Sequence, residues 1–204
     1  MITKIACGAL HGVDAFRVDL EVDFSRAGLP AFTMVGLAEG AVRESRDRVF
    51  AALRNGSLRL PPARVTVNLA PADRKKGGSS YDLPLAVGLL ASAGLMPGEA
   101  TEGFYLSGEL SLTGEIKPIA GALPLAILAR DQKAKGLLVP AANAREAAVV
   151  EGLNVYGVES LEQVAAFFNG RIELEPEIPV LPGRTAAEPQ SFHLDFSDVK
   201  GQEH

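Results

Sequence analysis

A short basic and glycine-rich segment holds the residues whose types and spacing could do chemistry. Three cations precede two glycines and two serines: Arg74, Lys75, Lys76, Gly77, Gly78, Ser79 and Ser80. A serine hydroxyl can act as a nucleophile when a base lies beside it. Backbone N–H groups at the start of a helix can instead bind a phosphate, with help from nearby cations. The segment therefore has two possible interpretations: it positions a nucleophilic serine, or it binds an anion.

The flanking residues predict a strand before this turn and a helix after it. Residues 64–69 alternate between apolar and polar side chains, which is typical of a half-buried strand. A mainly apolar run follows Ser80 and predicts a buried helix, with Leu83, Leu85, Ala86, Leu89 and Leu90 as its core residues. We therefore expect the serines to lie at the N-terminus of that helix and to cap it.

The rest of the chain alternates strand and helix signals. Residues 15–24 place Phe16, Val18, Leu20, Val22 and Phe24 on one side, which predicts a strand in a hairpin with residues 2–10. The other expected strands are 31–36, 137–139 and 154–158, with a hairpin over 104–118. The expected helices are 38–54, 120–134, 144–150 and 161–168. These elements predict an α/β domain, or a two-layer α+β domain, with a mixed sheet.

Composition limits the class of protein. No apolar run reaches the roughly 18 residues of a membrane helix, so we expect no membrane contact. The chain has one cysteine, which fits a reducing compartment and predicts a cytoplasmic protein. With three histidines besides, a zinc site of the Cys/His type is not expected, and no metal is assigned.

Charge and proline content divide the chain. Residues 43–76 hold nine cations and three acids, a net charge of +6. Residues 171–204 carry a net charge of −4. The folded domain is expected over residues 1–169, and four prolines with several acids predict an extended linker over 170–190. Residues 191–204 are again apolar and acidic and are interpreted as the beginning of another module.

Three motifs in order resemble one protein family. They are TMVGLAEGAVRESRDRVFAAL, then NLAPADRKKGGSSYDLPLAVGLL, then LSGELSLTGEIKPIAGALPLAILA. Together they resemble the N-terminal domain of the ComM/YifB family, the magnesium chelatase-like AAA+ ATPases, over residues 1–169. The later LDFSDVKGQ resembles the segment that precedes the Walker A motif in that family.

The resemblance implies a fold and a set of partners. The fold would be that of the Lon protease and of ribosomal protein S5 domain 2. The full-length protein would be a hexameric, ring-forming ATPase that uses ATP and Mg²⁺. It would process DNA by branch migration during natural transformation. This domain would then meet the AAA+ module of its own chain, other subunits and possibly DNA. The alternatives are a Lon-like serine peptidase, or a magnesium-chelatase-type subunit that acts on a protein or porphyrin.

The resemblance also bears on catalysis. Ser80 falls at or near the serine of the Lon Ser–Lys dyad, whose lysine would follow a Gly-Gly-Leu segment. Here the corresponding run, residues 120–124, reads AGALP and contains no lysine. Lys117 precedes this run and could act as the base only if it were placed differently from the lysine of Lon proteases. A serine without a base is a weak nucleophile. The Walker A pattern is also absent from these 204 residues. We therefore expect no catalysis and no cofactor in this chain, with Ser80 a vestigial position.

Two binding roles remain for the turn. Its glycines and serines are similar to a kinase phosphate loop of the GHMP type, but the neighbouring acid, Asp82, disfavours a bound anion. The remaining roles are contact with a nucleic-acid backbone and contact with a neighbouring subunit. The residues predicted to make such contacts are Arg74, Lys75, Lys76, Gly77, Gly78 and Ser79.

Overall fold

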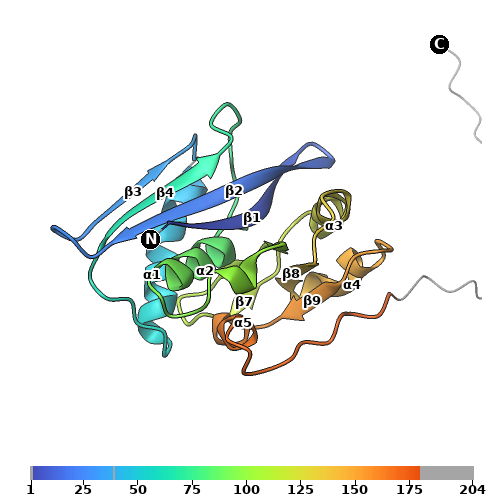
Figure 1. Ribbon diagram of the computed structural model, residues 1–204. Helices are drawn as coiled ribbons and strands as arrows, with labels where there is room; N and C mark the ends of the chain where they lie inside the picture. Colours follow the sequence, from blue (N-terminus) through green and yellow to red (C-terminus); the bar gives the residue numbers. More distant parts are fainter. Residues whose placement is uncertain (1, 39, 180–204) are drawn as a thin grey trace, which may run out of the picture.

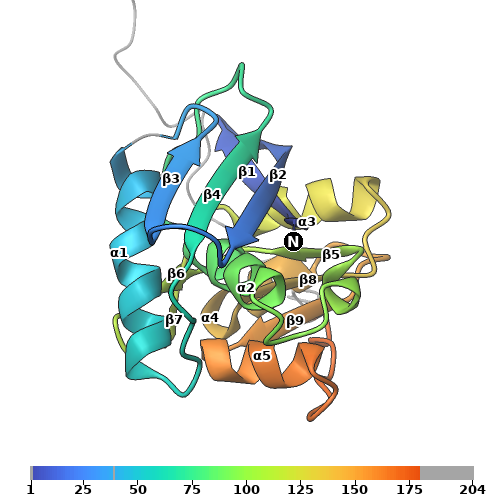
Figure 2. The ribbon, with the colours of Figure 1, turned by 60° about the vertical axis from the view of Figure 1, so that its left-hand side comes forward.

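A mixed seven-stranded sheet is the centre of the computed structural model, which describes residues 2–38 and 40–179 (Figures 1 and 2). The strand order is β3-β4-β2-β1-β5-β8-β9. The strands are β1 (Ile2–His11), β2 (Asp14–Ser25), β3 (Ala31–Val35), β4 (Arg64–Ala70), β5 (Phe104–Leu106), β8 (Gly136–Pro140) and β9 (Val155–Val158). β2 pairs antiparallel with β1 and β4, and the other neighbours are parallel. The expected mixed sheet is therefore present.

The hairpin of β1 and β2 follows from sequence alternation. Ile5 lies opposite Leu20 in its register, and both side chains are buried. The opposite face of β2 carries polar residues such as Arg17 and Glu21. Successive side chains of a strand point to opposite faces, so the sequence pattern fixes which face is covered. The predicted hairpin is confirmed.

Helix α2 (Asp82–Ser92) is the most deeply buried element. Every residue in it is buried, and a Cβ atom added at Gly88 would lie 2.8 Å from the Val22 side chain. Glycine at this position lets the helix approach the sheet closely. α1 (Gly40–Asn55) and α5 (Leu161–Phe168) contribute to the same hydrophobic core. These three helices cover one face of the sheet.

The opposite face is covered only in its second half. Leu138 belongs to the core below α2, whereas Leu137 and Val139 belong to a second core with α3 (Ala122–Asp131) and α4 (Ala141–Ala148). Because these neighbours along β8 point to opposite faces, α3 and α4 cover the other side. The expected two layers hold around β3 and β4, and the region of β5, β8 and β9 has three.

One predicted hairpin is shorter than expected. Residues 104–118 were predicted to form it, but Phe104–Leu106 is a strand of the main sheet, between β1 and β8. Only β6 (Glu109–Leu110) and β7 (Ile116–Lys117) pair as a hairpin. The reason is burial: Tyr105 and Leu106 are buried from opposite sides, as in an interior parallel strand.

The chain continues beyond α5 along the edge of the sheet. The Glu177 N–H donates to the Val155 carbonyl at 2.7 Å, so this part of the predicted linker lies beside β9. Residues 180–190 of the linker, and the module predicted for 191–204, lie outside the described residues. Within residues 2–38 and 40–179, no helix is long and apolar enough to cross a membrane.

Candidate functional site

The serine turn leads from the end of β4 into α2. Residues 71–81 form the loop at the top of Figures 1 and 2, beyond the end of β4. The predicted order of strand, glycine-rich turn and helix is therefore confirmed. The side chains of the turn do not share one environment, and they divide into an exposed group and an enclosed group.

Lys76 is the largest departure from the predicted basic patch. Its side chain is buried, and the Nζ ammonium donates to the carbonyls of Gly36 at 3.0 Å, Arg74 at 2.7 Å and Pro71. Burial lowers the pKa of Lys76, because removal from water disfavours the charged form. The ammonium joins backbone segments of its own domain, so in this structure Lys76 is not exposed for the DNA or subunit contact predicted for it.

The exposed group consists of Arg74, Lys75, Gly77 and Gly78. The Arg74 guanidinium lies 4.9 Å from the ring centroid of Phe16 on β2, which holds it against the sheet. Lys75 is exposed. Gly78 has a φ of 90°, a left-handed conformation that favours glycine. Arg74 and Lys75 are thus the two cations of the turn that a partner could reach.

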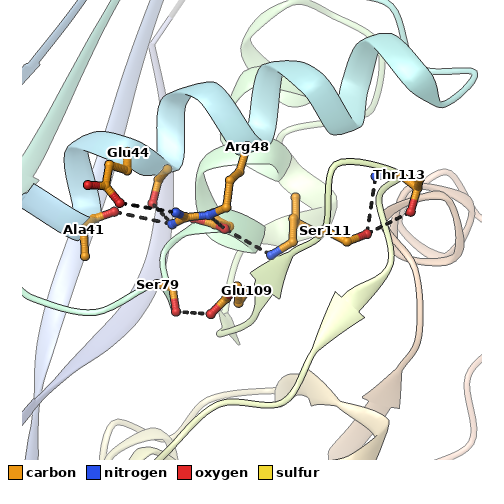
Figure 3. Close-up of polar contacts among 10 residues, drawn as sticks. Ala41, Glu44, Arg48, Ser79, Glu109, Ser111 and Thr113 are labelled. Atoms are coloured by element: carbon orange, nitrogen blue, oxygen red, sulfur yellow. Dashed lines mark hydrogen bonds and ion pairs between the residues drawn. The ribbon is translucent and has the colours of Figure 1, made fainter.

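The serines do not cap α2 as predicted. The helix N-cap is Tyr81, which makes no side-chain capping bond. The Ser79 hydroxyl instead donates to the Glu109 carboxylate on β6 (Figure 3). The Ser80 carbonyl accepts from the Gly108 N–H at 3.0 Å. The Gly108 carbonyl in turn accepts from the Leu83 N–H of the first turn of α2 at 3.0 Å, so the segment before β6 satisfies a donor that a cap could have satisfied.

A buried carboxylate forms an ion pair at the N-terminus of α2, and this pair is not among the sequence-based predictions. Asp82 is fully buried and accepts from Arg48 of α1 twice, at 2.7 Å from Nε and 3.0 Å from the second nitrogen (Figure 3). It also accepts from the Leu110 N–H at 3.1 Å. The bond to Asp82 raises the pKa of Arg48. An acid inside the apolar run after Ser80 was the available signal, because a buried carboxylate needs a partner.

This ion pair decides against a phosphate site. An anion bound at a helix N-terminus uses the free N–H groups and the positive end of the helix dipole. Here the chain's own carboxylate, Asp82, lies in the first turn of α2. A phosphate beside it would meet like charge. The geometry therefore favours a turn stabilised from within over an anion-binding loop.

Neither candidate lysine is placed as a base for the serines. Lys117 on β7 forms an ion pair with Glu115 at 2.7 Å, and the Lys76 ammonium donates to three backbone carbonyls. Within the described residues, no hydrogen bond joins a lysine to either serine. Residues 120–124, the run in which the resemblance would place the lysine, lead into α3, whose N-cap is Gly121. A carboxylate, from Glu109, is the group that meets Ser79.

The described part of the chain also lacks a cluster of side chains that could act as metal ligands. Within residues 2–38 and 40–179, no three His, Cys, Asp or Glu side chains lie close enough together to hold an ion. The polar residues around the turn form ion pairs and hydrogen bonds with one another, as Arg48 does with Asp82. The site can therefore hold elements together and present two cations.

At the level of a broad class, the chain has a distant similarity to Lon proteases. It is similar to the mitochondrial Lon protease homologue of Zea mays, with 27% identity over 176 residues that cover 80% of this chain and 18% of that protein. The family described as subunit ChlI of Mg-chelatase matches residues 20–143, more than half of the chain. The chain belongs to this family.

Two relatives match over almost the whole chain. Competence protein ComM of Haemophilus influenzae is 38% identical over 196 residues, which cover 96% of this chain and 38% of that protein. YifB of Escherichia coli is 38% identical over 195 residues, covering 96% and 37%. The predicted resemblance to ComM and YifB is confirmed. The chain spans less than two fifths of the length of these relatives.

Proposed function

We propose that this domain is a non-catalytic assembly module of a ring-forming, ComM/YifB-type AAA+ ATPase that processes DNA. ATP and Mg²⁺ would act in an AAA+ module of the same chain, and the hexameric protein would work in the cytoplasm. Similarity to a competence protein supports the link to DNA uptake. The main support for the proposal is the set of contacts at the serine turn, where Asp82 pairs with Arg48 and the Ser79 hydroxyl donates to Glu109.

The contacts of the serine turn argue against the peptidase alternative. A Ser–Lys mechanism needs a neutral amine within hydrogen-bond reach of the hydroxyl, about 3 Å away. Ser79 meets the Glu109 carboxylate, and Lys76 faces backbone carbonyls. A carboxylate cannot take the place of the amine in a Ser–Lys dyad. The arrangement therefore supports a structural role for Ser79, and within the described residues no lysine forms a hydrogen bond with Ser80.

Assembly predicts that the domain associates with itself. Sedimentation velocity of the 204-residue chain, run over a wide concentration range, measures this directly. We expect the mean mass to rise above the 21.4 kDa monomer as concentration increases. Association through charged surfaces should weaken with added salt, because screening shortens the range of the attraction. A single monomeric species at every concentration would contradict the assembly role.

DNA contact is a second candidate for the same domain, and it rests on the exposure of Arg74 and Lys75 at the loop tip. Such cations hold phosphates without reading sequence. We expect Arg74→Ala with Lys75→Ala to weaken DNA binding and to reduce the salt slope of log K by about 2. Fluorescence anisotropy across salt concentrations measures both quantities. Arg130→Ala, an exposed cation on α3, is the matched control. An unchanged slope in the double variant would exclude the loop from DNA contact.

A further inference from the structure

A hollow lies at the β3 edge of the sheet, away from the serine turn. It has a volume of about 590 Å³ and lies between α1, the first residues of β3 and β4, and residues 59–63. Phe32 and Phe50 line it and meet edge to face at 5.7 Å. Both rings are only half-buried, so an apolar surface is left open to solvent.

Three arginines surround this apolar surface. Arg46 lies 5.5 Å above the Phe32 ring, and Arg54 and Arg59 also line the hollow. Within the described residues, no carboxylate forms an ion pair with any of the three. We call this feature the arginine groove. Open apolar surface with unpaired cations around it fits a partner that combines apolar and acidic side chains.

The opposite edge of the sheet carries such a partner. Residues 172–178, here called the acidic ridge, read IELEPEI and alternate apolar and acidic residues. The ridge lies beside β9, where the Glu177 N–H bonds to the Val155 carbonyl. Ile178 is 79% exposed, and Glu173 and Glu175 are exposed as well. Glu177 already pairs with Arg145 at 3.6 Å, which leaves Glu173 and Glu175 for a partner.

The ridge does not occupy the groove of its own subunit, because it is held beside β9 by the bond from Glu177 to Val155. β3 and β9 are the two edge strands of the seven-stranded sheet. Within the described residues, no hydrogen bond or ion pair joins residues 172–178 to a residue that lines the groove. Figure 1 shows β3 and α1 on one side of the molecule and β9 with the following segment on the other. A contact between the two surfaces must therefore join different molecules.

We propose that the acidic ridge of one subunit docks in the arginine groove of the next. Ile178 would contact the open aromatic surface, and Glu173 and Glu175 would pair with Arg54 and Arg59. Because the two surfaces differ, the contact is head to tail, and repetition of it generates a closed ring or an open filament. This inference rests on the assembly role proposed above and names the surfaces that would carry it.

The test joins two positions across the contact. Leu60 lines the groove and Ile178 belongs to the ridge, so one chain carries Leu60→Cys and a second, mass-tagged chain carries Ile178→Cys. The native Cys7 is buried and does not compete for a thiol reagent. With a short bismaleimide, we expect the mixed product to exceed either self-linked product about tenfold, a difference of about 1.4 kcal/mol.

Charge exchange provides the second readout. Arg54→Glu with Arg59→Glu should reduce the mixed product about tenfold or more, because attraction becomes repulsion. Glu173→Arg with Glu175→Arg on the partner chain should restore it. Arg43→Glu is the matched control, since Arg43 is exposed on α1 outside the groove. Circular dichroism confirms that each variant is folded.

Three results would overturn the inference. They are the absence of a mixed product, a dominant product between two Leu60→Cys chains, and loss of the mixed product when residues 180–204 are deleted. The last would make that segment the occupant of the groove. If the wild-type chain self-associates in sedimentation but no mixed product forms, the interface is wrong and the assembly role stands. If the wild-type chain stays monomeric, the assembly role itself fails.

Discussion

Replacement of Asp82 by alanine is expected to lower the free energy of unfolding by about 3–5 kcal/mol, the usual cost of removing one partner of a buried ion pair. The carboxylate is fully buried and accepts from Arg48 and from the Leu110 N–H. Its loss leaves the buried Leu110 N–H without its acceptor. It also leaves the partly buried guanidinium with only longer contacts, to the Ala41 carbonyl, the Ser45 hydroxyl and the Glu44 carboxylate. The pair joins α1, α2 and β6, so all three contacts are lost together.

Urea unfolding of matched variants measures this effect. Asp82→Asn keeps an acceptor for Leu110 but removes the charge, so its cost should be smaller, about 1–3 kcal/mol. Asp47→Ala removes an exposed acid of α1 and should change stability by no more than about 0.5 kcal/mol. A double-mutant cycle with Arg48→Ala should give a coupling energy above about 1 kcal/mol. Equal losses in Asp82→Ala and Asp47→Ala would refute the ion pair as a structural element.

Replacement of Lys76 by alanine is expected to lower the free energy of unfolding by about 2–3 kcal/mol, since hydrogen bonds to a charged group contribute roughly that much when partly offset by desolvation. Its ammonium donates to carbonyls of Gly36, Pro71 and Arg74. These belong to the connection before α1 and to the serine turn. Without the ammonium, the turn loses its attachment to that connection.

Lys75 provides the control for Lys76, because it is the adjacent cation and is exposed. Lys75→Ala should change stability by no more than about 0.5 kcal/mol. The two variants have the same composition and net charge, so a difference between them reports position alone. Denaturant unfolding of both proteins measures it. Matching midpoints and slopes for the two variants would show that the ammonium of Lys76 is solvated after all.

The elements of the fold were largely predictable because their signals are local. Alternation over residues 15–24 identifies β2 and its buried face. The short strand Phe104–Leu106 was misassigned to a hairpin, because three consecutive residues show no period and its partners, β1 and β8, are distant in sequence. Strand partners of this kind depend on the whole sheet, which no short window of sequence contains.

The interior of the candidate site was less predictable, for a similar reason. A lysine in a basic turn is normally solvated, and nothing near Lys76 shows that Gly36, 40 residues earlier, supplies an acceptor. The pair of Arg48 and Asp82 spans 34 residues and exists only because α1 packs against α2. Sequence spacing located the turn correctly, and tertiary packing determined which of its charges are exposed.

Chemical labelling of the serine turn tests the central claim most directly, namely that this turn is structural. The folded 204-residue chain is treated with a fluorophosphonate, and Ser79 and Ser80 are examined by peptide mass spectrometry. We predict no modification at either residue, because within residues 2–38 and 40–179 no lysine forms a hydrogen bond with either hydroxyl and Ser79 donates to Glu109. Stoichiometric labelling of either serine, lost on its replacement by alanine in a folded variant, would contradict the account.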